Sequence, residues 1–283
     1  MTGAAVLALR PTLSGAGQRL VVDLGSPYRC ISSAVLGGGL GWVRTWLDLE
    51  VERPYVRTDP EVHLLKESAD LPAPVVGMLT AARVARFQGA EVGGARSVAT
   101  VGVGHALAAA GSRPRLVPTP PPTTRRGAEE LTAPPIVGGR PQAAGFQAAG
   151  FQAPAGQPTG GRRGGLPAGD RPYLAPAVGT INLLVVVGEP LTDAGLVNAV
   201  QTAVEAKAQA LAAARVLAAN AEGYATGTAT DSVCVACPPG ALVPFAGPVT
   251  RVGAELAQAV MEAVRSGAAL DRATAALPDG AGT

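Results

Sequence analysis

A stretch rich in proline and glycine, residues 112–178, divides this chain into two patterned halves and constrains its fold more than any other feature. It holds 13 of the chain's 25 prolines and 11 glycines, and its apolar residues are sparse and without a period. Such a stretch cannot bury enough apolar surface to offset the entropy lost on ordering. We therefore expect residues 112–178 to be a flexible insertion, with a docking segment for a partner as the alternative.

The first half carries the short apolar runs that are typical of an antiparallel β-meander. Its expected strands are Ala4–Leu9, Arg19–Leu24, Cys30–Val35, Thr45–Val51 and Ser97–Val103, with a turn over Leu13–Gln18. In Thr45–Val51, polar Asp48 and Glu50 alternate with apolar residues, which is typical of a strand. A helix is expected over Pro60–Ala69, because Asp59 can cap it and proline suits the first helical position.

The second half has a strand–helix–strand–helix rhythm. Continuous apolar runs predict buried strands at Ile181–Val187 and Asp231–Ala236. Thr192 or Asp193 can cap the first helix, and Thr250 can cap the second. The expected apolar stripes are Leu196, Val200, Val204 and Leu211 in the first helix, and Val252, Leu256, Val260 and Val264 in the second.

Together these patterns predict a single α/β domain with a mixed sheet. Residues 1–111 would supply its N-terminal β-meander, and residues 179–270 its strand–helix–strand–helix half. The insertion would interrupt this domain, and residues 271–283 would form a flexible tail.

The charge distribution argues against nucleic-acid binding by the two patterned halves. The whole chain has a net charge of +2, and the insertion carries eight arginines against Glu129, Glu130 and Asp170. The remaining residues are therefore mildly acidic and provide no basic field for a nucleic acid. Weak binding of an anionic partner by the Arg-rich insertion alone stays an open alternative.

Cysteine content and hydropathy exclude two further classes of protein. Three cysteines are too few, and odd in number, for a disulfide-stapled secreted module. The longest apolar runs fall far short of the ~20 residues of a membrane-spanning helix. The N-terminal sequence lacks the basic start and long apolar region of a signal peptide. We therefore expect a cytoplasmic protein with no membrane span.

Polar residues at the start of a buried strand are the strongest candidates for chemistry. The run Ala225–Asp231 places Thr226, Thr228 and Thr230 ahead of Asp231, so hydroxyls, backbone N–H groups and a carboxylate come together. The alternative is an ordinary loop whose threonine side chains satisfy turn backbone.

Other candidates are weaker when taken singly. The Gly37–Gly39 run follows a strand and permits close backbone approach to a bulky ligand. Glu205 and Lys207 lie two apart on an alanine-rich helix, so they face different sides, and each is either solvated or inward-pointing and catalytic. His105 follows a predicted strand, where functional loop residues gather. The Cys234–Cys237 spacing lies on a strand with no second pair, so no metal site is expected.

Several of these segments occur together in one known family. They are Ser32–Gly39, Val76–Ala82, Thr100–Gly104, Gly179–Asn182, Glu205–Lys207, Ala225–Asp231 and Val235–Pro238. Through them, in the same order along both halves, the chain resembles the adenosylcobinamide amidohydrolase family. Ala229 stands where the family pattern TGTGTD has a glycine, and His105 stands where a small polar residue is more usual.

The resemblance implies a role in corrinoid salvage. Members hydrolyse the amide that joins the aminopropanol side chain to the corrin ring of adenosylcobinamide. The expected products are adenosylcobyric acid and 1-amino-2-propanol. The cobalt would belong to the corrinoid substrate, so no cofactor or protein-bound metal is expected.

Amide hydrolysis requires an activated nucleophile, donors for the oxyanion and an acid for the leaving amine. We expect Asp231 or Glu205 to activate water. Lys207 or His105 would protonate the leaving amine.

The threonines offer two further roles. Thr226 and Thr228, with their backbone N–H groups, would hold the carbonyl oxygen. A threonine nucleophile, Thr228 or Thr230, is the covalent alternative. The residues expected to bind substrate are Gly37, Gly38, Gly39, Thr80, Asn182 and Thr230. The rival functions are a non-catalytic corrinoid-binding protein and a generic amidase of small metabolites.

Overall fold

The computed structural model of this protein describes residues 9–15, 18–53, 55–111 and 179–275, which form a single α/β domain around a mixed sheet of eight strands. The strands are β1 (Thr12–Ser14), β2 (Arg19–Ser32), β3 (Gly39–Glu50), β4 (Val75–Thr80), β5 (Gln88–Val92), β6 (Ala95–Gly102), β7 (Thr180–Val187) and β8 (Ser232–Cys237). The helices are α1 (Pro60–Glu67), α2 (Asp193–Ala213) and α3 (Arg251–Ala275), with short 3₁₀ turns at Val84–Arg86 and Ala109–Gly111. The predicted fold class is confirmed. The predicted flexible insertion and nearly all of the expected strand Ala4–Leu9 lie outside the described residues.

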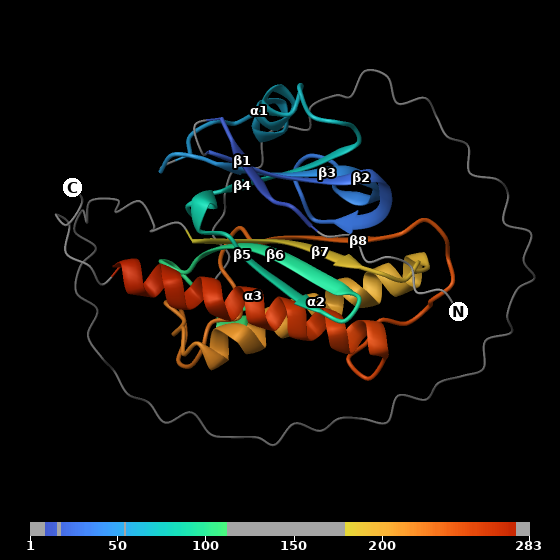
Figure 1. Cartoon of the computed structure of the whole chain (residues 1–283). Coiled ribbons are helices and arrows are strands. Elements are labelled where there is room, and N and C mark those ends of the chain that lie inside the picture. The colour runs from blue at the N-terminus through green and yellow to red at the C-terminus, as the bar shows by residue number, and fades with distance from the viewer. Residues whose placement is uncertain (1–8, 16–17, 54, 112–178, 276–283) are drawn as a thin grey trace, which may run out of the picture. The chain divides into compact units, whose positions relative to one another are not determined.

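The sheet bends at its second strand. The strands follow the order β4-β3-β2-β8-β7-β6-β5, with β1 paired to β2, and β2 is bonded to both β3 and β8. A register shift between Asp23 and Tyr28 interrupts the pairing of β2 with β3. An irregularity of this kind bends a strand and increases its twist. As a result, β1–β4 form one layer and β5–β8 lie beneath it as a second layer (Figure 1).

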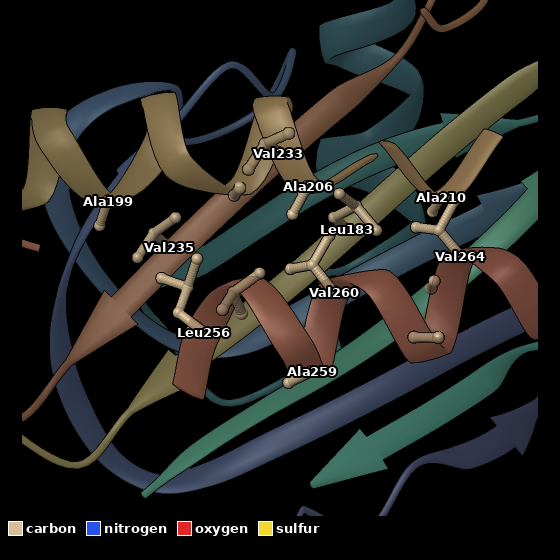
Figure 2. Close-up of a cluster of buried hydrophobic side chains, with 14 of the residues drawn as sticks. Leu183, Ala199, Ala206, Ala210, Val233, Val235, Leu256, Ala259, Val260 and Val264 are labelled. Carbon is tan, nitrogen blue, oxygen red and sulfur yellow. The ribbon is translucent and has the colours of Figure 1, made fainter. Parts of the chain in front are cut away.

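Helices cover the outer faces of both layers. In Figure 1, α1 lies over the β1–β4 layer, whereas α2 and α3 cover the far side of β5–β8. Trp46, Met78 and Leu184 are among the side chains that form a core between the layers. The larger core lies between the sheet and the two long helices; Figure 2 shows Leu183 and Val260 within it. Because both faces are covered, every residue of β6, β7 and β8 is buried. This agrees with the continuous apolar pattern of β7 and β8.

Helix α2 begins and packs through small residues. The Thr192 side chain accepts a hydrogen bond from Gly195 N at 3.1 Å, so the predicted cap is confirmed. Ala199, Ala206 and Ala210 lie on the face toward α3 in Figure 2, where small side chains permit close packing. Val204, expected on this buried face, is 41% exposed. The prediction for Val204 is wrong. Alanine lies on most sides of α2, so the positions of the larger apolar side chains did not indicate which face is buried.

The described helices also differ from the prediction at one N-terminal cap and at two C-terminal ends. The Asp59 side chain makes no capping hydrogen bond and instead pairs with Arg57, and α1 ends at Glu67 rather than at Ala69. Helix α3 continues to Ala275, so the first residues of the expected tail are helical. None of the described helices is both long and apolar enough to span a membrane.

The strands of the first half differ from the predicted antiparallel meander, because β4, which was not predicted, pairs parallel with β3. The expected turn before Arg19 contains the short strand β1, and β2 is one long strand where two separate ones were expected. Val35 lies outside any strand. Asp48 is fully buried although it alternates with leucine, because the second layer of the sheet covers its face.

Candidate active site

The end of β6 and the starts of β7 and β8 bring the candidate residues together. Gly102 on β6 pairs with Thr180 on β7. Thr180 Oγ1 lies 2.9 Å from Thr230 Oγ1, which belongs to the loop that enters β8. Asp231 follows immediately and accepts a hydrogen bond from Ile181 N at 3.0 Å. Hydrogen bonds thus hold the loop Ala225–Asp231 against the start of β7, so this segment is not a free surface loop.

A buried ion pair forms the centre of this site. Lys207, from α2, donates to Asp231 Oδ2, and the two side chains are only 7% and 11% exposed. Thr228 donates to the same carboxylate twice, from its backbone N to Oδ2 at 3.1 Å and from Oγ1 to Oδ1. With Ile181 N, four donors occupy the Asp231 oxygens. A carboxylate has about four acceptor positions, so Asp231 suits the orientation of Lys207 and Thr228 better than proton abstraction from water.

Two glycines allow this cluster to close. A Cβ at Gly227 would overlap Asp231 Oδ2 and lie 2.8 Å from Lys207 Nζ. A Cβ at Gly179 would lie 2.6 Å from Gly102 O and 3.1 Å from Thr228 Cγ2. Both positions are too crowded for a side chain, so glycine is required there by packing around the ion pair.

The expected oxyanion donors are already engaged. The backbone N of Thr226 donates to Leu107 O at 2.9 Å, and its Oγ1 accepts from Ala109 N at 3.0 Å. The backbone N of Thr228 donates to Asp231, as described above. In this arrangement both N–H groups have protein partners, and a carbonyl oxygen would have to displace one of these to bind there. The backbone N of Thr230 lies 3.5 Å from Thr228 Oγ1, which places another donor beside that hydroxyl.

His105 lies close to the cluster, whereas Glu205 does not face it. His105 is half-buried on the turn after β6, and its backbone N would lie 3.3 Å from a Cβ at Gly179. Glu205 is exposed on α2 and accepts a hydrogen bond from Gln201 at 3.4 Å. Glu205 and Lys207 thus face different sides, as predicted, and the role of Glu205 as a base is not supported because its carboxylate faces solvent.

The Gly37–Gly39 run forms an exposed turn at the start of β3. Gly37 has φ +71°, and a Cβ there would lie 2.6 Å from Val75 O. A Cβ at Gly38 would overlap Ala34 O. The turn itself therefore explains these glycines, and the predicted role in binding substrate has no support from their position.

Asp48, which the sequence did not single out, forms a second buried polar group with Asn182. Thr100 Oγ1 donates to Asp48 Oδ2 at 2.5 Å, and Asn182 Nδ2 donates to Asp48 Oδ1 at 2.7 Å and to Leu79 O at 3.0 Å. Burial raises the pKa of Asp48 to about 7, against the opposing effect of these two hydrogen bonds. Asn182 Oδ1 is buried without a hydrogen-bond partner among the described residues.

The burial of this group corrects two further predictions. Asn182 is fully buried and Thr80 is 1% exposed, with Thr80 Oγ1 accepting from Ala82 N at 3.0 Å. Their side chains hold strands together inside the protein. They therefore do not line a cleft open to substrate, which corrects the expectation from the sequence.

Because of the Asp48 carboxyl, we expect the free energy of unfolding to decrease as the pH rises. Its pKa is about 7 in the folded protein against an ordinary value of 3.8, so between these values the folded state binds the proton and the unfolded state does not. The free energy of unfolding should then decrease by about 1.4 kcal/mol per pH unit between about pH 4 and pH 7, and level off above. Urea unfolding across this range should show the slope in the wild type and a smaller slope in Asp48→Asn.

Other carboxyl groups with a shifted pKa do not change the free energy of unfolding in the same pH range. The pKa values of Asp23, Asp59 and Asp70 are lowered, mainly by a backbone hydrogen bond to the first and by arginine side chains at the others. Those groups act below about pH 4 and in the opposite direction. Glu50, on the same strand, raises the pKa of Asp48 by charge repulsion and is kept in both proteins. Equal slopes in the wild type and Asp48→Asn would contradict the prediction.

Comparison with known proteins assigns the chain to a family. A sequence profile of the adenosylcobinamide amidohydrolase family matches residues 11–276. The chain belongs to this family. An adenosylcobinamide amidohydrolase of Halobacterium salinarum is 44% identical over 102 residues, 36% of this chain and 40% of that protein. An uncharacterized protein of Methanocaldococcus jannaschii is 33% identical over 88 residues, 31% of this chain and 34% of that protein. The matched segments thus span less than half the length of both relatives.

The adenosylcobinamide amidohydrolase match covers both halves of the domain, including the Lys207–Asp231 pair. Ala229, which replaces a glycine of the family pattern, is exposed. Arg215 is the one non-glycine residue of the described chain with a positive φ, so Ala229 adopts a backbone conformation that alanine tolerates. Its methyl group therefore introduces no backbone strain beside the cluster.

Proposed function

We propose that this protein hydrolyses the amide between the corrin ring and the aminopropanol side chain of adenosylcobinamide, giving adenosylcobyric acid and 1-amino-2-propanol. The observation that carries the proposal is the Thr228 hydroxyl, which donates to a carboxylate that Lys207 holds in a buried ion pair. The membership of the chain in the adenosylcobinamide amidohydrolase family supports the choice of substrate.

Thr228 is the proposed nucleophile. Its side chain is half-buried, and its hydroxyl proton already points to Asp231 Oδ1, so an oxygen lone pair remains for attack on an amide carbon. Attack would form a C–O bond while the proton passes to Asp231. Collapse would break the C–N bond, release protonated aminopropanol and leave an ester on Thr228. Water would then attack the ester carbon and give a proton to His105, which replaces the one donated to the amine, while Asp231 returns its proton to Thr228 Oγ1. This gives the carboxylic acid and restores the hydroxyl.

The surrounding groups have supporting roles in this proposal. Lys207 keeps a positive charge beside Asp231, so the carboxylate stays oriented toward Thr228. His105, on the adjacent turn, would protonate the leaving amine. The backbone N of Thr230 would stabilise charge that develops near the attacked carbonyl.

The proposal includes no protein-bound cofactor, because the cobalt is part of the corrinoid. The corrinoid is the proposed small-molecule partner, and the mildly acidic domain is not expected to bind nucleic acid. We place the reaction in the cytoplasm, where a salvaged corrinoid would be processed.

The decisive experiment is incubation of the full chain with adenosylcobinamide, followed by chromatography. We expect adenosylcobyric acid and 1-amino-2-propanol to appear in equal amounts. Binding without either product would favour the non-catalytic corrinoid-binding protein. Neither binding nor product would contradict the proposal and favour an amidase of smaller metabolites.

A further inference from the structure

A polar cleft opens where β3 and β4 end. It has a volume of about 720 Å³ and is lined in part by Glu50, Glu52, Arg53 and Arg83. This volume falls in the range of roughly 300–1,000 Å³ that small-molecule sites occupy. None of the residues expected from the sequence to bind substrate lines it, and the reaction proposed above does not use it.

Hydrogen bonds orient several of the charged side chains that line the cleft. Glu50 accepts hydrogen bonds from Arg83 Nη1 at 3.0 Å and from Val84 N at 2.9 Å. Arg53 Nε donates to Ala81 O at 3.1 Å. Asp271, at the far wall, accepts from Val103 N at 2.8 Å. Groups that are ordered before binding lose less conformational entropy when a ligand arrives.

The charges in the cleft balance. Arg53, Arg83 and Arg86 face three carboxylates, those of Glu50, Glu52 and Asp271. A balanced lining gives no preference for a phosphate or another strongly charged group. It does match a neutral ligand with many carboxamides, because guanidinium groups donate to amide oxygens and carboxylates accept from amide N–H groups.

The cleft lies next to the cluster that contains Thr228. Asp271, in its wall, is bonded to Val103, two residues before His105. A Cβ at Gly102 would lie 3.2 Å from Ala82 Cβ, in the same wall, and Gly179 packs between Gly102 O and Thr228 Cγ2. The end of β6 therefore contacts both the wall of the cleft and the residues beside the proposed nucleophile.

We propose that this cleft binds the corrin macrocycle through its peripheral amide side chains, and thereby brings the aminopropanol amide to Thr228. The inference rests on the proposed function, since a corrinoid is the amide-rich ligand that it assigns. Arg83 and Glu52 become specificity-determining residues, which act on binding of the macrocycle and not on the reacting bond.

The test separates binding from turnover. Spectrophotometric titration with adenosylcobinamide should give a dissociation constant about tenfold higher for Arg83→Gln and Glu52→Gln than for the wild type, as expected for loss of a charge-assisted hydrogen bond. The kcat of both variants should stay within about threefold of the wild type, so the effect appears in KM. Ala81→Trp, which places a large side chain in the cleft wall, should weaken binding further.

Arg57→Gln is the matched control, because Arg57 is also exposed and paired with a carboxylate but lies before α1, outside the cleft. Its dissociation constant should equal that of the wild type. Thermal unfolding should confirm that each variant is folded. Unchanged binding by Arg83→Gln, Glu52→Gln and Ala81→Trp, in a protein whose wild type hydrolyses adenosylcobinamide, would overturn the cleft inference and leave the proposed function standing. A wild type that neither binds nor hydrolyses the corrinoid would overturn both.

Discussion

Lys207→Met is expected to lower the free energy of unfolding by about 3–5 kcal/mol and to remove most of the turnover. The reason is the burial of the pair: Lys207 and Asp231 are 7% and 11% exposed. Removal of one partner leaves the other charge in a poorly solvated position, with no compensating ion. Three hydrogen-bond donors to Asp231 remain, from Ile181 N and Thr228, so the loss should fall toward the lower end of this range.

Urea unfolding of four variants measures this effect: Lys207→Met, Asp231→Asn, the double variant with both changes, and a control. Lys66→Met is the matched control, since Lys66 is the other lysine of the chain and is exposed on α1. Its unfolding free energy should differ from that of the wild type by less than about 0.5 kcal/mol. The double variant Lys207→Met with Asp231→Asn removes both charges, so it should be more stable than the sum of the two single changes predicts, by about 1–3 kcal/mol.

Activity and stability should then separate. The double variant should regain part of the lost stability but no turnover, because a neutral carboxamide in place of the Asp231 carboxylate would no longer accept the proton of Thr228. Additive changes in unfolding free energy would show that the two side chains do not stabilise each other. A normal kcat in Lys207→Met would exclude the role of the pair in orienting Thr228.

The sequence predicted two buried strands, one helix cap and one loop, because each depends on residues that are close together in the chain. The apolar runs of β7 and β8 are continuous because helices cover one face of these strands and the β1–β4 layer covers the other. The cap of α2 at Thr192 needs only the next three residues. The Ala225–Asp231 loop was likewise predictable, since Gly227 and Thr228 contact Asp231 within one short segment.

Features that depend on the bend of the sheet could not be predicted. Asp48, Thr100 and Asn182 lie on three strands, and they meet because the first layer lies over the second. Nothing in the alternation of Asp48 with leucine indicates that another layer covers it. The choice between Glu205 and Lys207 was also open, because alanine surrounds both on α2 and the buried face became evident only from the packing of the helix.

Thr228→Ala is expected to lower kcat by at least about 10³-fold while the dissociation constant for adenosylcobinamide stays within about threefold. The change removes the proposed nucleophile but keeps the backbone N–H bond to Asp231, so the loop retains one of its two contacts with the carboxylate. Thr228→Ser keeps the hydroxyl and should retain at least about a tenth of the wild-type kcat. Thr12→Ala, on the exposed strand β1, makes the same chemical change away from the site. It should leave both kcat and the dissociation constant unchanged.

An acyl-enzyme is the second readout of the same prediction. In the wild type, rapid acid quenching during turnover should give a fraction of chains whose intact mass is raised by the adenosylcobyryl group, located on the peptide that contains Thr228. Thr228→Ala should show none. If Thr228→Ala kept more than about a tenth of the wild-type kcat, attack by water would replace the covalent route. In that variant three donors to Asp231 remain and the acceptor position of the Thr228 hydroxyl on Oδ1 is open, so Asp231 would be the base that activates water.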